Sequence, residues 1–191
     1  MYFLIDYENT RNAGMIGTEY LLPTDHVILF YSDSTPNMEA RHLIDIQKSC
    51  CAFEAYKLVN ARSNALDFYI STRIGELFGS DCTDKIVIIS EDNGFRSVKD
   101  FWESHRGLSH RVYLNKNIEQ GILSSNEQTV RRKKVRVDQN PINIDNFCKS
   151  CSEFQNTRSV LMSIFKDTEF MPVLFEIEQI IKTTSSLTDL Y

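Results

Sequence analysis

The sequence has no long hydrophobic run, because none of its apolar stretches approaches the roughly 20 residues that a helix needs to cross a bilayer. Its first residues, Met1–Ile5, lead directly into Asp6 and Glu8, with neither a basic leader nor a cleavage site of small residues. We therefore expect these residues to form a strand rather than a secretion signal, and we expect a cytoplasmic protein.

Cysteine, glycine and proline are scarce. The 191 residues include five Cys, seven Gly and four Pro, and an odd, scattered set of cysteines does not indicate a disulfide framework. Cys148 and Cys151 have the spacing of a zinc half-site, but no second CxxC and no HxxxH accompanies them. With 42% hydrophobic and 25% charged residues, the composition is that of a globular protein rather than a disordered or fibrous one.

Motifs of several enzyme classes are also missing. No GxxxxGKS, GxxxxGKT or GxGxxG loop occurs, which disfavours the binding of nucleoside triphosphates and dinucleotides. No Gly-x-Ser-x-Gly elbow is present, and the four histidines are dispersed without HxxxH or HxH spacing. The remaining candidates for chemistry are carboxylates.

Short apolar runs alternate with segments of helical length. The expected strands are Tyr2–Ile5, Val27–Tyr31, Ala52–Val59, Ile86–Ile89 and Arg111–Leu114. The expected helices are Asn37–Ser49, Asn64–Phe78 and Phe95–Ser104. This alternation predicts right-handed βαβ crossovers and a three-layer α/β/α sandwich with a parallel sheet.

Composition divides the chain into three parts. The α/β pattern occupies residues 1–125, a basic linker follows at 126–140, and 141–191 is predicted to be a small helical tail. Apolar residues in that tail make a homodimer an open expectation. The net charge is −5, yet five of the 21 basic residues fall within six positions of the linker: Arg131, Arg132, Lys133, Lys134 and Arg136. Such a run either is a solvated linker or holds a polyanion.

Three aspartates fall at the ends of expected elements. Asp6 ends the first strand, Asp92 follows the fourth, and Asp67 lies in the opening turn of a helix. Because open α/β sheets bind ligands outside the carboxyl ends of their strands, Asp6 and Asp92 converge if the first and fourth strands are neighbours. Clustered carboxylates repel unless a cation compensates them, and Mg²⁺ or Mn²⁺ suits such oxygen ligands and promotes hydrolysis of phosphate esters.

Each aspartate also has a structural interpretation. Asp67 follows Asn64 by three residues, as at a capped helix start, and Asp92-Asn93-Gly94 is a turn signal. Asp6 is harder to explain in this way, because a carboxylate at the end of a buried strand is costly unless it is paired or bound to a metal.

Three motifs resemble those of the PIN-like nucleases, and in particular of their NYN-type branch. They are Leu4–Asn9, Asn64–Phe68 and Ile89–Phe95, and they recur in the order of the family over roughly residues 1–125. The resemblance implies a five-stranded parallel sheet of order 3-2-1-4-5 and cleavage of RNA or single-stranded nucleic acid. It also implies that Mg²⁺ or Mn²⁺ binds to Asp6, Asp67 and Asp92.

The resemblance implies further that Asn9 and Ser90 orient ligands or substrate, with Asn93 beside them. The sequence departs from the family at a fourth acid, for which Glu39 is nearest in context and Asp33 is a rival. No position matches that acid convincingly, and a surface or cap role is the favoured interpretation of both residues.

Two classes of function therefore compete. The first is a metal-dependent endoribonuclease whose basic run holds the phosphate backbone, helped by Lys57, Arg62 and Arg96. Tyr7 and Tyr69 are available to stack bases, as is Phe95, for which a place in the core is the favoured interpretation. The second is a catalytically inert PIN-like module that binds RNA or a protein, which the small set of acids favours. A metal-dependent hydrolase of small phosphate esters is a weaker third alternative.

Overall fold

The computed structural model describes residues 1–58, 64–80, 82–106, 108, 111–125 and 129–139, with seven separate residues between 149 and 160. Val59, Arg62, Cys148, Cys151 and the predicted helical tail beyond residue 160 lie outside the described residues. The chain divides into two compact units, Met1–Arg136 and Val137–Tyr191. Within the described residues, no helix combines the length and the apolar character that a membrane span requires.

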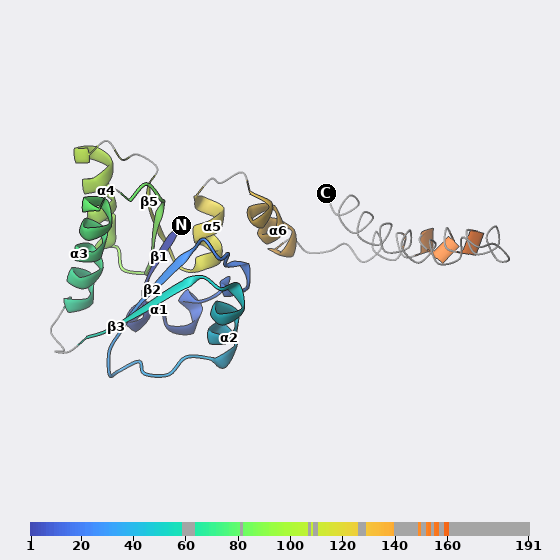
Figure 1. Ribbon diagram of the computed structural model, residues 1–191, viewed down its shortest axis with the longest axis horizontal. Helices are drawn as coiled ribbons and strands as arrows, with labels where there is room; N and C mark the ends of the chain where they lie inside the picture. The colour runs from blue at the N-terminus through green and yellow to red at the C-terminus, as the bar shows by residue number, and fades with distance from the viewer. Residues whose placement is uncertain are drawn as a thin grey trace. The chain divides into compact units, whose positions relative to one another are not determined.

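A five-stranded parallel sheet forms the centre of the first unit (Figure 1). Its strands are β1 (Tyr2–Asp6), β2 (His26–Tyr31), β3 (Ala52–Lys57), β4 (Ile86–Ile89) and β5 (Val112–Asn115). They lie in the order β3-β2-β1-β4-β5, which confirms the predicted architecture. The helices are α1 (Tyr7–Gly14), the 3-10 helix η1 (Thr18–Tyr20), α2 (Ala40–Ser49), α3 (Ala65–Gly79), α4 (Phe95–Arg106), α5 (Ile118–Ser124) and α6 (Val130–Gln139).

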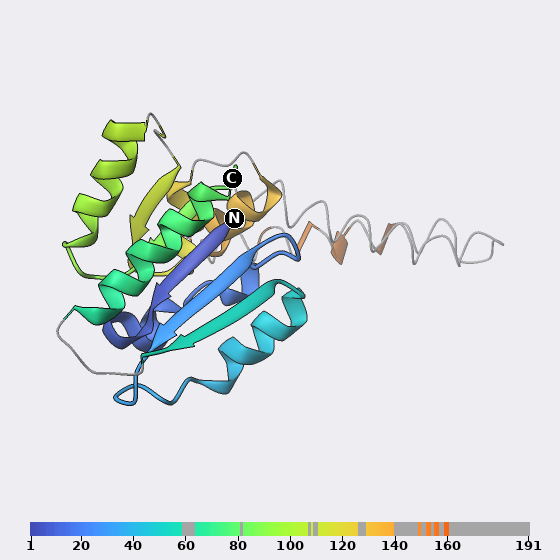
Figure 2. The ribbon, with the colours of Figure 1, turned by 60° about the vertical axis from the view of Figure 1, so that its left-hand side comes forward.

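The central strands are apolar along their whole length because both faces of the sheet are covered. Successive side chains of a strand point to opposite faces, so Phe3 and Ile5 join one core cluster while Leu4 joins the other. Residues of α1, α5 and α6 complete the first cluster, and residues of α3 and α4 complete the second. Figure 2 shows α3, in green, crossing one face of the sheet.

The segment predicted as a basic linker differs from that expectation. Helix α6 covers most of it, the first compact unit extends to Arg136, and Val135 is fully buried in a core cluster. The Arg131 guanidinium, only 8% exposed, pairs with the carboxylate of Asp25, which is itself buried. The helix is therefore held to the domain by one apolar and one ionic contact, and Arg131 is not available to a phosphate.

Candidate functional site

The site lies where the strand order reverses. β1 pairs with β2 on one side and with β4 on the other, and this type of junction leaves a crevice at the carboxyl edge of an open sheet. The register pairs Ile5 with Ile89, which places the next residues of the two strands, Asp6 and Ser90, side by side. The fold therefore brings together a buried carboxylate and a hydroxyl that are 84 positions apart in the sequence.

Two hydrogen bonds hold the side chain of Asp6. The Ser90 hydroxyl donates to Oδ2 at 2.8 Å, and the backbone N–H of Asn9 donates to Oδ1 at 3.3 Å. The same hydroxyl accepts the backbone N–H of Asp92 at 3.0 Å and the amide of Asn9 at 3.4 Å. Ser90 thus joins the acid at the end of β1 to the loop that carries Asp92, as a residue that orients ligands would.

Asp67 reaches the same edge through the crossover from β3 to β4. Because β3 runs parallel to β2 and β1, the chain leaves β3 at the carboxyl edge and α3 begins there. Asn64 caps α3 with a φ of 60°, a left-handed conformation that asparagine adopts more readily than most residues. This start places Asp67 in the first turn of α3, at the pocket that the other two aspartates line.

One pocket of about 280 Å³, here called the acidic pocket, brings the three predicted aspartates together. Its lining residues are Asp6, Glu8, Asn9, Asn64, Ala65, Leu66, Asp67 and Asp92. Glu8 is the member that the sequence analysis did not single out. Its Oε1 accepts the hydroxyls of Ser32 and Ser34, both at 2.9 Å. The feature of the sequence that could have identified Glu8 is its position two residues after Asp6, where a strand ends and a helix begins.

Other predicted site residues lie elsewhere. Glu39 pairs with Arg41 at 2.7 Å and Asp33 pairs with Lys57 at 2.5 Å, and neither acid lines the acidic pocket. Asn93 lines a neighbouring pocket instead.

The prediction of base stacking by Tyr7 is wrong, because its ring is 2% exposed, and Phe95, 1% exposed, lies in the core as the sequence favoured. Their apolar surfaces are used in the core, one on each side of the sheet. Tyr69 is 41% exposed and Phe68, beside Asp67, is 69% exposed, so two exposed rings lie in the first turns of α3, close to Asp67 in the sequence. Exposed aromatic rings next to a pocket are the groups on which bases can stack.

The acidic pocket concentrates negative charge. Burial raises the pKa of Asp6, hydrogen bonds from Ser90 and Asn9 act in the opposite direction, and the charges of Asp67 and Glu8 raise it further. Burial also raises the pKa of Asp67, followed by the charges of Asp92 and Glu8. Within the described part of the chain, no lysine or arginine forms an ion pair with any of the three aspartates.

The chemistry of these donors fits a hard divalent cation. Carboxylate and amide oxygens are the ligands that Mg²⁺ and Mn²⁺ prefer, and the pocket offers no competing basic side chain among the residues that line it. No three His, Cys, Asp or Glu side chains among the described residues form a ready-made metal-binding group. This arrangement remains compatible with Mg²⁺, which keeps several waters and binds through only one or two carboxylates.

The predicted basic residues do not line this pocket. Arg131 is buried, Lys133, Lys134 and Arg136 are exposed on α6, and Lys134 lies 5.6 Å from the centre of the Tyr20 ring. None of the five belongs to the lining of the acidic pocket. Any phosphate contact that α6 makes is therefore outside the pocket itself.

Comparison with known proteins identifies the fold. A family model described as PIN domain matches residues 1–113, which is more than half of the chain and includes all three aspartates. No curated protein and no solved structure matches the chain.

Proposed function

The chain belongs to the PIN domain family, and we propose from this premise that it is a metal-dependent endoribonuclease that hydrolyses RNA or single-stranded nucleic acid. PIN domains are typically nucleases that use divalent cations. The observation that carries the proposal is Asp6, a carboxylate 3% exposed, in one pocket with Asp67 and Asp92 and without a basic partner among the described residues. A structural acid in such a position would be expected to have a lysine or arginine beside it.

Each acid has a distinct role in this proposal. Asp6, fixed by Ser90 and by the start of α1, would hold Mg²⁺ or Mn²⁺, and Asp67 from α3 and Asp92 from the loop after β4 would supply further oxygen ligands to one or two such ions. When bound, such an ion polarises a phosphoryl oxygen and lowers the pKa of a water for attack on phosphorus.

Neighbouring polar groups support these acids. Ser90 keeps the Asp6 carboxylate in one orientation, and Asn9 assists through its backbone N–H. Glu8, held by two serine hydroxyls, is placed to take up a proton from an incoming water.

RNA as the substrate, and membership of the NYN-type branch, remain predictions from the three motifs. Two features support a single-stranded substrate: the exposed rings of Phe68 and Tyr69 beside Asp67, and the exposed basic side chains of α6. Stacking on aromatic rings requires bases that are not paired in a duplex.

A catalytically inert module that binds RNA or a protein is the second candidate. The observation that favours it is that the described residues contain no ready-made group of three metal-binding side chains. In that case the acidic pocket would be a feature shared with the family but without a catalytic role, and the protein would bind its partner without cutting it.

Cleavage assays separate the two candidates. Wild type is incubated with single-stranded RNA and with single-stranded DNA in Mn²⁺, in Mg²⁺ and in EDTA, beside Asp6→Asn and the control Asp33→Asn. Asp33 is an exposed acid paired with Lys57 outside the pocket, so the same chemical change there leaves the site intact.

The proposal predicts that wild type and Asp33→Asn cut with either metal and leave 5′-phosphate and 3′-hydroxyl ends, whereas EDTA and Asp6→Asn abolish cleavage. If purified wild type cuts neither nucleic acid in any metal, while its fold and binding are intact, the inert module is the correct assignment.

A further inference from the structure

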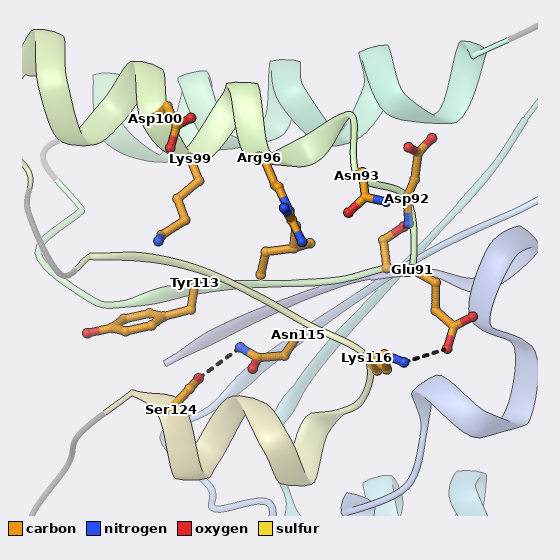
Figure 3. A pocket seen from close by; sticks show the side chains of 12 residues that line it. Glu91, Asp92, Asn93, Arg96, Lys99, Asp100, Tyr113, Asn115, Lys116 and Ser124 are labelled. Atoms are coloured by element: carbon orange, nitrogen blue, oxygen red, sulfur yellow. Dashed lines mark hydrogen bonds and ion pairs between the residues drawn. The ribbon is translucent and has the colours of Figure 1, made fainter.

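A second pocket, larger than the acidic one, opens between α4 and β5 (Figure 3). We call it the α4–β5 pocket. It measures about 450 Å³, which lies within the range of roughly 300–1,000 Å³ typical of ligand sites. The loop after β4, the first half of α4, the end of β5 and Ser124 of α5 form its walls. The family match over residues 1–113 does not assign it a role.

The two pockets share a lining residue in the loop after β4. Asp92 lines both of them, and Ser90, whose hydroxyl holds Asp6, lines the α4–β5 pocket as well. A chain molecule with one group at the acidic pocket would reach the α4–β5 pocket by passing Asp92. A polymer that carries a phosphate at regular intervals could place one phosphate at each pocket.

The charge of the α4–β5 pocket differs from that of its neighbour. Three basic and three acidic side chains line it, whereas no basic side chain lines the acidic pocket. Arg96 and Lys99 are three residues apart on α4, so they lie on one face of that helix, and Figure 3 shows both extending from α4 toward β5. Lys116 approaches from the end of β5.

None of these three basic side chains forms a strong ion pair with a described residue. Lys99 lies 3.6 Å from Glu103 and Lys116 lies 3.9 Å from Glu91, and ion pairs at such distances between solvent-accessible side chains are weak. Arg96 forms no ion pair with any described residue. A phosphate group can accept two parallel hydrogen bonds from a guanidinium through two of its oxygens, which makes Arg96 the best-suited anchor.

The opposite wall suits a sugar and a base. Tyr113 and Asn115 lie along β5 facing the same space (Figure 3). The Asn115 amide is fixed by a hydrogen bond of 2.8 Å from its Nδ2 to the Ser124 hydroxyl, so the polar group is held in place before a ligand arrives. A half-buried tyrosine beside an ordered amide provides one apolar surface and one hydrogen-bonding group.

We propose that the α4–β5 pocket binds the nucleotide next to the scissile phosphate, with Arg96 and Lys99 holding its phosphate and the Tyr113–Asn115 wall contacting its sugar and base. This inference rests on the proposed nuclease function, because the order of the two subsites is set by cleavage in the acidic pocket. The bound nucleic-acid strand then runs from the acidic pocket past Asp92 to the basic side chains of α4.

The test measures binding separately from cleavage. Full-length Asp6→Asn, in EDTA, is titrated with a fluorescein-labelled oligouridylate of about 12 nucleotides, a length within the usual range for single-strand sites. The same titration is made with Arg96→Gln/Lys99→Gln added, and with the control pair Arg41→Gln/Lys48→Gln on α2. Both pairs remove two positive charges from one helix, and neither control residue lines either pocket.

The proposal predicts that Arg96→Gln/Lys99→Gln weakens binding at least about tenfold. The slope of log K against log salt should become shallower by about 0.7, because the variant no longer neutralises the one phosphate that Arg96 and Lys99 hold together. The control pair should leave affinity and slope unchanged, and thermal melting should show that both variants remain folded.

Two outcomes overturn the inference. Either the α4 pair binds the oligonucleotide like the control pair, or the Asp6→Asn protein does not bind it at all. A loss of binding in the α4 pair together with no cleavage by wild type has a different meaning: the α4–β5 pocket then binds nucleotides as inferred, and the proposed nuclease function is what fails.

Discussion

At the scale of single residues, Asp6 is an acid whose environment disfavours its charge. Burial and the neighbouring carboxylates raise its pKa in the folded chain, so the folded state binds the proton more tightly than the unfolded state does. Stability contributed by this group is therefore present at low pH and is lost as pH rises from the unfolded pKa through the folded one. At neutral pH the ionised carboxylate destabilises the metal-free fold.

Asp6→Asn should consequently be more stable than wild type at neutral pH in the presence of EDTA. Asparagine keeps an oxygen for the Ser90 hydroxyl and carries no charge. The advantage should shrink as the pH falls into the range where Asp6 is protonated in both states. Denaturant titrations at several pH values measure this difference, and a variant less stable than wild type at every pH would contradict it.

Ser90 is the residue that links the acids, and Ser90→Ala should lower metal affinity or activity about 10–100-fold, as loss of a group that orients a metal ligand commonly does. The variant removes the donor to Asp6 and the acceptor of the Asp92 N–H. Isothermal titration with Mn²⁺ checks the affinity. Ser97→Ala, at an exposed position of α4, is the matched control and should behave as wild type.

At the scale of secondary-structure elements, α5 packs against the sheet through a glycine. A Cβ added at Gly121 would lie 2.7 Å from a methyl group of Val87 and 3.4 Å from the ring of Phe3. By contrast, a Cβ at Gly75 in the middle of α3 would meet nothing within 4 Å. Both glycines lie in helices, yet the same substitution has opposite consequences at the two positions.

Gly121→Ala should therefore destabilise the fold by about 1–3 kcal/mol, because the helix must move away from β4. Gly75→Ala should stabilise it by about 0.5–1 kcal/mol, because alanine is the better helix former. Urea denaturation of both variants measures the two effects. Equal changes of the same sign would show that α5 does not approach the sheet as closely as described.

The elements that the sequence predicted are those with strong periodicity. Continuous apolar runs identified β1 and β4, and the apolar stripe of α3 identified that helix. Helix α1 was missed because its sequence is polar and its backbone breaks at Arg11, where φ is 49°. Helix α6 was missed because the partner that buries Arg131 is Asp25, which is 106 residues away and gives no local signal.

The site was predictable to a similar degree. Asp6 and Asp92 could be placed because each follows an apolar strand, and the parallel sheet brings the ends of such strands to one edge. Asp67 could not be placed from the sequence, because its position at this edge depends on how the chain crosses from β3 to β4. Only the three-dimensional structure shows that crossover. Glu8 and the α4–β5 pocket depend on which way side chains point, and a pattern of residue types does not determine this.

At the scale of the whole molecule, the basic run of α6 serves two roles. Arg131 is buried and paired with Asp25, whereas Lys133, Lys134 and Arg136 remain exposed. The division leaves three positive side chains exposed on one helix of a protein whose net charge is −5, and under the proposed function these would attract a polyanion. It also means that the five residues should respond differently to substitution.

Arg131→Met should destabilise the protein by up to about 3–5 kcal/mol, since the buried Asp25 carboxylate loses its guanidinium partner and keeps the terminal ammonium of Met1 at 3.5 Å. Lys133→Met, two positions along α6, should change stability by no more than about 0.5 kcal/mol. Chemical denaturation measures both. If the two substitutions cost the same, the helix is not anchored through Arg131.

The order of the strands along the chain has a consequence for synthesis. Asp6 emerges first from the ribosome, but the hydroxyl that orients it belongs to Ser90, and Asp92 follows still later. An incomplete polypeptide thus carries its first acid without the groups that assemble the pocket around it. Only after β4 has been translated and has inserted beside β1 does the nascent protein possess the full set of carboxylates.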